Sequence, residues 1–194
     1  MVNYFINEEV ASSEFKKLSY FHLANYLRTF EGDTDSHQFK DDSYFEDALN
    51  LYYFAKELRA LLFTAIQSIE IAIRSRMIDS IALTHGAFWF ADEYLATNKR
   101  LFAENLEHIR KEVNRSKEDF ILDHKEKYDS PEFPPVWKTL EVVTFGTLSK
   151  LYNNLNDIHL KKIIAKDFKL LQHIYLESWM KSDGSVRNKK VINR

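Results

Sequence analysis

Cysteine is absent from the 194 residues, and the residues that break helices are scarce. The lack of cysteine excludes disulfides and zinc sites with cysteine ligands, and it makes the cytoplasm the expected compartment. Glycine occurs four times and proline three times, with all three prolines in the stretch SPEFPP. So few breakers predict long helices joined by polar connections.

Long apolar runs and a large charge of one sign are also missing. The longest apolar stretch, Ala60 to Ile66, is interrupted by Thr64 and is far too short to cross a bilayer, so we expect no membrane contact. The opening MVNYFINEEVASSEF carries acids early and lacks the apolar region of a signal peptide. The net charge of −2 gives no broad basic field, so a nucleic-acid partner would have to bind a local patch.

The composition is that of an ordinary folded protein. Hydrophobic residues make up 45% of the chain and charged residues 29%, which predicts a substantial core. The length indicates a single domain over residues 1–194. The stretch EGDTDSHQFKDDS, residues 31–43, is acidic and polar, and we interpret it as a surface loop.

The most regular feature is an apolar stripe that predicts a helix over about 44–82, capped by Ser43. We expect Ile69 and the rest of the stripe to be buried against a helix over 136–155, because burying a Leu or Ile side chain contributes about 1.5–3 kcal/mol. The stripe recurs at steps of three or four residues and consists of Leu51, Phe54, Ala55, Leu58, Leu62, Ala65, Ile66, Ile69 and Ile73.

Weaker patterns predict the remaining helices. They cover residues 9–30, 98–127, 136–155 and 161–180, and a short helix starts near Asp92. Few strand signals occur, so the predicted fold class is all-α, with one long central helix among several shorter ones.

The polar side of the long helix gathers residues that can contact phosphate. Lys56, Arg59, Gln67, Glu70 and Arg74 fall within a sector of roughly 80°. Glu70 precedes Arg74 by one turn, which is the order that favours an ion pair. Periodicity alone leaves two alternatives, a solvated stripe with one surface pair or a binding face.

No pattern indicates a metal or a cofactor. None of the seven histidines has another at the spacing of a helical metal site, so we expect no metal ligands. His124, in FILDHKEKYDSP, lies close to the proline loop and is either structural or able to orient a ligand. No glycine-rich phosphate loop, nucleophile elbow or dinucleotide fingerprint is present, so no cofactor is expected.

Two segments resemble the Abi-like family of bacterial abortive-infection proteins. They are LRALLFTAIQSIEIAIRSRM, Leu58 to Met77, and PPVWKTLEVVTFGTLSKLYNNL, Pro134 to Leu155. The resemblance extends over about residues 15–188 and implies antiphage defence by abortive infection. Smaller features stand in the family's order: Leu23 to Tyr26, then Phe88-Trp89-Phe90, then His124.

The Abi-like family in turn resembles the HEPN superfamily, whose α-helical members often cleave RNA without a metal and often dimerise. This resemblance implies a HEPN-like fold, RNA as a partner and a homodimer, and it leaves open a neutralising partner of unknown kind. It also implies that Glu70, Arg74, Arg59 and His124 contribute to RNA binding. We expect Glu70 and Arg74 to face the same cleft as the last helix, near Arg187.

The catalytic motif implied by the resemblance is incomplete in this chain. The family reads arginine, asparagine, three further residues and histidine; Arg187 and Asn188 match, and Ile192 stands where histidine is expected. We also expect Ser182-Asp183-Gly184 to interrupt the helix that carries the motif. A truncated or degenerate chain end would produce this pattern.

The chemistry of the motif predicts a weak or inactive ribonuclease. Histidine suits proton transfer because its pKa lies near neutrality, and isoleucine cannot move a proton. Arg187 can still grip phosphate oxygens. The alternative is a non-catalytic helical module that binds RNA or protein, either a pseudoenzyme or a truncated remnant.

Overall fold

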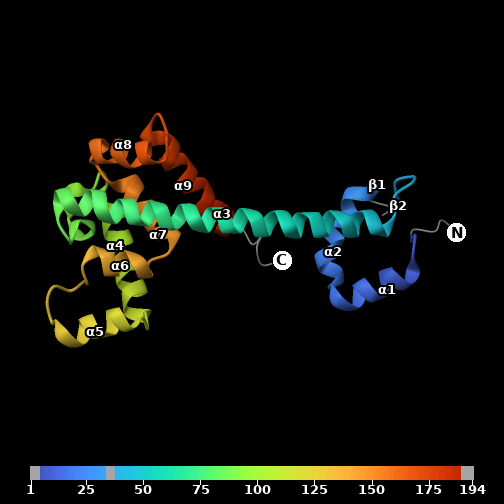
Figure 1. Ribbon diagram of the computed structural model, residues 1–194, viewed down its shortest axis with the longest axis horizontal. Coiled ribbons are helices and arrows are strands. Elements are labelled where there is room, and N and C mark those ends of the chain that lie inside the picture. The colour runs from blue at the N-terminus through green and yellow to red at the C-terminus, as the bar shows by residue number, and fades with distance from the viewer. Residues whose placement is uncertain (1–4, 34–37, 189–194) are drawn as a thin grey trace. The chain divides into compact units, whose positions relative to one another are not determined.

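Helices dominate the computed structural model, which describes residues 5–33 and 38–188 (Figure 1). The all-α class and the long helix are confirmed. The α-helices are α1 Glu8–Lys17, α2 Tyr20–Leu27, α3 Phe45–His85, α4 Lys99–Arg115, α5 Asp119–Lys127, α6 Val136–Val142, α7 Phe145–Asn154, α8 Ile158–Asp167 and α9 His173–Asn188. Short 3-10 helices lie at η1 Arg28–Phe30, η2 Trp89–Ala91 and η3 Glu93–Leu95.

Each of the helices predicted over 9–30, 98–127, 136–155 and 161–180 is divided into two, because the backbone leaves the helical conformation between them. Ser19 adopts an extended conformation between α1 and α2. Thr144 separates α6 from α7, and its hydroxyl accepts from the amide of Thr147 at 3.4 Å. Lys169 takes a φ of 57° between α8 and α9, which turns the chain. Helical periodicity continued across all of these points, so it did not reveal them.

The composition of the acidic segment 31–43 predicted a surface loop, but part of the segment forms paired strands. Glu31–Asp33 forms strand β1, which pairs antiparallel with strand β2, Gln38–Phe39. The amide of Lys40 then donates to the carbonyl of Phe30 at 2.9 Å and extends the pairing. The hairpin has too little apolar alternation to be recognised from its sequence.

Helix α3 begins and ends with identifiable signals. It starts at Phe45 without a cap from Ser43, and the Asp47 carboxylate instead accepts from the amide of Tyr44 at 3.0 Å. It ends at His85, after which Gly86 takes a φ of +85° and donates its amide to Ala82 at 2.8 Å. A glycine in the left-handed region is a common helix terminator because it carries no Cβ.

The chain divides into two compact units, residues up to Gln67 and residues from Ser68 onward. In the first unit a small core packs on the start of α3, with the ring of Phe45 against Phe5 at 5.6 Å and Phe15 at 4.7 Å. The buried members of this core are Ala11, Leu23, Phe45 and Leu49.

The second unit has a larger core that joins the end of α3 to α4 through α9. Tyr152 is fully buried in it, and its hydroxyl donates to the carbonyl of Lys161 at 3.1 Å. Lys161 is itself buried, and its ammonium contacts Glu177 at 2.9 Å, which ties α8 to α9. Leu176 and Met180 are also buried, so the first part of α9 is anchored to the core by both polar and apolar contacts.

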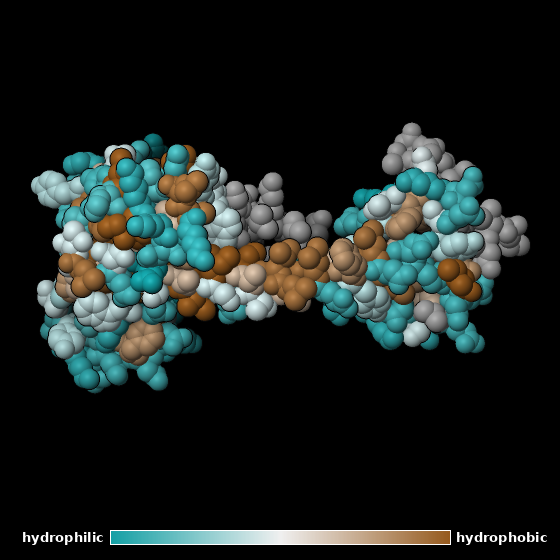
Figure 2. Space-filling view, turned by 45° about the horizontal axis from the view of Figure 1, so that its top comes forward, coloured by the Kyte–Doolittle hydropathy of each residue, from teal (hydrophilic) through white to brown (hydrophobic). Residues whose placement is uncertain are grey.

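The predicted burial of the α3 stripe is correct at its end and wrong in its middle. Ile73 is fully buried, whereas Leu62 is 51% exposed and Ile69 is 37% exposed. The first core uses α3 no further than Tyr53, and the second uses it only from Ile73 onward. Figure 2 accordingly shows apolar side chains gathered along the surface of α3. Periodicity identified the stripe but could not identify which turns a core covers.

None of the helices among residues 5–33 and 38–188 combines the length and the apolar character needed to cross a membrane.

Candidate functional site

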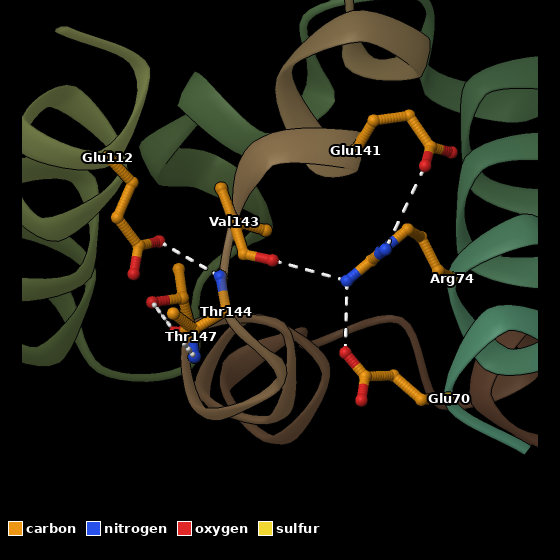
Figure 3. A network of polar contacts seen from close by, with 7 residues as sticks. All are labelled: Glu70, Arg74, Glu112, Glu141, Val143, Thr144 and Thr147. Atoms are coloured by element: carbon orange, nitrogen blue, oxygen red, sulfur yellow. Dashed lines mark hydrogen bonds and ion pairs between the residues drawn. The ribbon is translucent and has the colours of Figure 1, made fainter. Parts of the chain in front are cut away.

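Arg74 is the centre of a polar network between α3 and the turn that joins α6 to α7 (Figure 3). Its Nη2 donates to Glu70 Oε1 at 3.1 Å and to the carbonyl of Val143 at 3.2 Å. Its Nη1 lies 3.8 Å from Glu141 Oε2. The predicted pair of Glu70 and Arg74 is thus confirmed, and the guanidinium also holds the backbone where α6 ends.

The Glu70–Arg74 pair is shielded from solvent, unlike an ordinary pair on a solvated helix face. The side chains of Arg74 and Glu70 are 14% and 13% exposed, whereas that of Glu141 is 51% exposed. The Nε of Arg74 is buried and has no hydrogen-bond partner within the described part of the chain. A shielded guanidinium requires strong partners, because desolvation of a charge is costly.

The geometry defines which side of Arg74 a ligand can reach. Both hydrogens of Nη2 are used by Glu70 and Val143, so this edge is occupied. Among the described residues, the Nη1 edge contacts Glu141 alone, at a longer distance and in a more exposed position. A phosphate at this edge would compete with the Glu141 carboxylate for Nη1.

A second set of contacts positions the same turn from the side of α4. Glu112 accepts from the amide of Thr144 at 3.2 Å, and its side chain is 11% exposed. The hydroxyls of Thr144 and Thr147 lie 3.1 Å apart at the start of α7. Figure 3 shows Arg74 and Glu112 on opposite sides of this turn. Neither Glu112 nor the Val143 carbonyl was singled out from the sequence. Both contacts involve backbone groups of the turn, and backbone groups leave no sequence signal.

Arg59, a predicted RNA-binding residue, lies in the first unit and has a partner there. Its Nη1 donates to the hydroxyl of Tyr26 at 2.8 Å. The nearby Lys56 lies over the ring of Tyr53 at 5.9 Å. These contacts join α3 to α2 or lie along α3 itself, so the basic side chains contribute to packing within the first unit. A role for Arg59 toward RNA stays a prediction.

His124 lies on α5 and is 8% exposed. Its ring lies 4.8 Å from that of Tyr128, and its Nε2 is buried without a hydrogen-bond partner among the described residues. Desolvation by burial lowers the pKa of the imidazole, and the charge of Lys138 lowers it further. The ring is therefore neutral at neutral pH, so His124 would contact RNA as a neutral donor or acceptor. That role also stays a prediction.

Arg187 and Asn188 lie in the last turn of α9, and only the backbone is described there. The predicted interruption at Ser182-Asp183-Gly184 is wrong, because α9 continues through these residues to Asn188. A single glycine lowers helix propensity without ending a helix that is anchored by packing upstream. Ile192 lies outside the described residues.

Metal chemistry finds no support in the described ranges, where no group of three or more histidine, cysteine, aspartate and glutamate side chains is arranged to hold an ion. The site is thus an arginine–carboxylate network on a helical scaffold. Such a network can position a turn, and it can bind an anion where one carboxylate is displaced.

The fold and the network define an all-α protein organised along one long helix. The family model for Abi-like proteins matches residues 14–190, which is most of the chain. The chain therefore belongs to the Abi-like family and is a protein of the abortive-infection type. Neither the curated proteins nor the solved structures gave a match.

Proposed function

We propose that this chain acts in antiphage defence as a HEPN-type RNA-binding protein whose own cleavage activity is weak or absent. The observation that carries the proposal is the family match, which extends through Arg187 and Asn188. These residues correspond to the start of the arginine-asparagine-x-x-x-histidine motif. The residue type supports phosphate binding by Arg187, since a guanidinium stays charged and can grip two oxygens.

The expected weakness follows from the residue at the sixth position of the motif. General acid–base catalysis contributes about a hundred- to ten-thousand-fold, and Ile192 cannot supply it. A neutral His124 could transfer protons in principle, but it is shielded and lies on another helix. The protein is therefore expected to hold RNA more effectively than it cleaves it.

The direct test restores the missing side chain. Purified protein is incubated with mixed single-stranded RNA in EDTA, together with Ile192→His and the double variant Ile192→His/Arg187→Ala. We expect no or slow cleavage by the original chain, faster cleavage by Ile192→His, and its loss in the double variant. Robust cleavage by the original chain would refute the proposal, and its loss in Arg187→Ala would mean that another residue supplies the proton.

The RNA-binding role of Arg74 has a test that avoids unfolding the protein. If RNA phosphate binds the Nη1 edge, Glu141→Gln removes the competing carboxylate and should tighten binding, while Arg74→Gln should weaken it. The slope of affinity against salt concentration should become shallower in Arg74→Gln, because one phosphate contact is lost. If Glu141→Gln and Arg74→Gln both bind RNA with the affinity of the original chain, the role of Arg74 is structural.

A homodimer is part of the proposal. It is supported by exposed apolar side chains on α3 within the first unit: Phe54, Leu58, Leu61 and Leu62, which are 42% to 71% exposed. Large exposed apolar patches commonly mark interaction sites. Light scattering should give the mass of a dimer for the original chain and of a monomer for Leu58→Glu/Leu62→Glu. A monomer mass for the original chain at high concentration would contradict the dimer.

A further inference from the structure

One peptide bond in the turn between α6 and α7 is held from both sides by charged side chains. Its carbonyl, from Val143, accepts from Arg74 Nη2 at 3.2 Å. Its amide, from Thr144, donates to Glu112 Oε2 at 3.2 Å. The carbonyl and the amide of a trans peptide point in opposite directions, and Figure 3 shows Arg74 and Glu112 on opposite sides of the turn. We call these two side chains and the peptide bond between them the peptide clamp.

The charges of the peptide clamp match the dipole of the peptide that they hold. The guanidinium of Arg74 contacts the carbonyl, which is the negative end of the dipole, and the carboxylate of Glu112 contacts the amide, which is the positive end. Hydrogen bonds to charged groups are about twice as strong as neutral ones. Both side chains are largely shielded from solvent. The peptide plane is therefore fixed, and with it the direction in which α7 starts.

The peptide clamp lies next to a contact with α9. Phe145 directly follows the clamp as the first residue of α7, and its side chain is almost fully buried. Its ring packs edge-on against the ring of Trp179 on α9, with the two centroids 5.9 Å apart. Such edge-to-face pairs are favourable only in particular orientations. The direction of α9 is therefore coupled to the peptide that Arg74 and Glu112 hold.

Trp179 lies at a point of α9 where a small change of direction has a large effect. Trp179 and Met180 are the last α9 residues in the described core, and the helix continues from there to Asn188. At 1.5 Å per residue, Arg187 lies roughly 10 Å beyond Met180, so a tilt of about 10° moves its backbone by about 2 Å. A misplacement of about 1 Å can cost about a hundredfold in rate.

We propose that the peptide clamp and Trp179 together position the end of α9. The clamp fixes the start of α7, and the contact of Phe145 with Trp179 transmits this direction to α9. Glu112 and Trp179 are thus positioning residues for Arg187 and act without touching a ligand. That Arg187 serves RNA rests on the proposed function. The coupling of helix direction to the clamp rests on the contacts alone.

Spin labels test the direction of α9 without reference to RNA. The chain has no cysteine, so labels attach only to introduced positions, here Lys99→Cys on α4 and Ser185→Cys on α9. Electron paramagnetic resonance measures the distance between the two labels. We expect this distance to shift or broaden by about 2 Å in Glu112→Ala and in Trp179→Leu. It should stay unchanged in Glu104→Ala, which removes a more exposed acid from the same helix as Glu112.

Conservative variants distinguish positioning from a general loss of packing. Glu112→Gln keeps an acceptor for the Thr144 amide and Trp179→Phe keeps an aromatic ring, so both should retain the original distance. Met77→Ala removes a buried side chain outside these contacts and should also retain it. Circular dichroism establishes which variants fold, and if Trp179→Leu does not fold, Glu112→Ala decides alone. The original distance in Glu112→Ala would overturn the inference.

RNA affinity provides a readout whose sign separates positioning from charge. Removing the Glu112 carboxylate reduces the repulsion of phosphate, so charge alone predicts that Glu112→Ala binds RNA more tightly. Positioning predicts the opposite, a loss of about tenfold or more. Because that loss acts through Arg187, Glu112→Ala/Arg187→Ala should bind no more weakly than Arg187→Ala alone.

The label distance and the RNA affinity fail independently. If the original chain binds no RNA, the proposed function is refuted, and the label distance still tests the clamp. A changed distance with equal or tighter RNA binding in Glu112→Ala would show that the direction of α9 does not serve binding, which overturns the positioning role. Weaker RNA binding with an unchanged distance would assign the effect of Glu112 to another route and would overturn it as well.

Discussion

Two stretches of α3 carry the same kind of apolar stripe, but one is exposed to solvent and the other is buried. In the first, Leu58 and Leu62 are 42% and 51% exposed; in the second, Ile73 and Met77 are fully buried. Both follow steps of three and four residues, so their sequence patterns are equivalent. The difference arises from other elements, since α4 and α6 through α9 contribute side chains to the core around the second stretch.

The comparison shows what an amphipathic pattern means. It predicts that a helix has an apolar side, and it does not predict that the same chain covers that side. An uncovered stripe either stays exposed at a cost in solubility or is covered by another molecule. The four predictions below test this contrast in order of decreasing effect.

The largest effect is expected at the covered stretch. Met77→Ala should lower the free energy of unfolding by about 2–5 kcal/mol, because it removes a fully buried side chain and leaves a cavity. Urea unfolding followed by circular dichroism measures this change. A loss below 1 kcal/mol would mean that the core around the end of α3 is loosely packed.

Arg74 should contribute less to stability than Met77, because its side chain makes polar contacts and does not fill the apolar core. Arg74→Ala removes the Nη2 donor from Glu70 and from the Val143 carbonyl, and should cost about 1–3 kcal/mol. Glu141→Ala is the matched control, and its loss should stay within ~0.5 kcal/mol because this partner is half exposed. Equal losses in both variants would show that the network has no preferred partner.

The end of α3 is also held by a pH-dependent contact. His85 Nε2 lies 3.1 Å from Asp157, and the pKa of that carboxyl lies below its ordinary value of 3.8, mainly because it accepts from the amide of Leu160 and also contacts His85. A carboxyl whose pKa is lower in the folded than in the unfolded state stabilises the fold at pH values above its unfolded pKa. This stabilisation is lost as the pH falls through the pKa of the folded state.

Asp157→Asn should therefore be less stable than the original chain at pH 6, by under about 1 kcal/mol. The difference should shrink as the pH falls below 3.8. Unfolding midpoints in urea at pH 6 and pH 3 measure this. A difference that is constant with pH would assign the effect to the shape of the cap rather than to its charge.

The smallest effect is expected at the uncovered stretch. Leu61 is 71% exposed, so Leu61→Ala should change the free energy of unfolding of the monomer by no more than ~0.5 kcal/mol. The measurement is made at a concentration at which light scattering gives a monomer. A destabilisation comparable to that of Met77→Ala would show that the stretch is covered within one chain.

Prediction from the sequence was reliable where a signal is local. The long helix and the pairing of Glu70 with Arg74 depend on residues close together along the chain, and the family resemblance depends on short segments that can each be read locally. Helix boundaries were less predictable, because the cap at Thr144 and the turn at Lys169 interrupt a continuing apolar pattern. The continuation of α9 past Gly184 was missed because packing upstream outweighs the low helix propensity of one glycine.

By itself, the sequence determined the all-α class, the apolar stripe of α3, the absence of cysteine chemistry and the family to which the chain belongs. Only the tertiary structure decided which turns of that stripe are buried, that Arg74 holds the Val143 carbonyl, and that the Asn105 amide has no partner among the described residues. The physical reason is that secondary structure follows from neighbouring residues, whereas burial and hydrogen-bond satisfaction depend on elements far away in the chain.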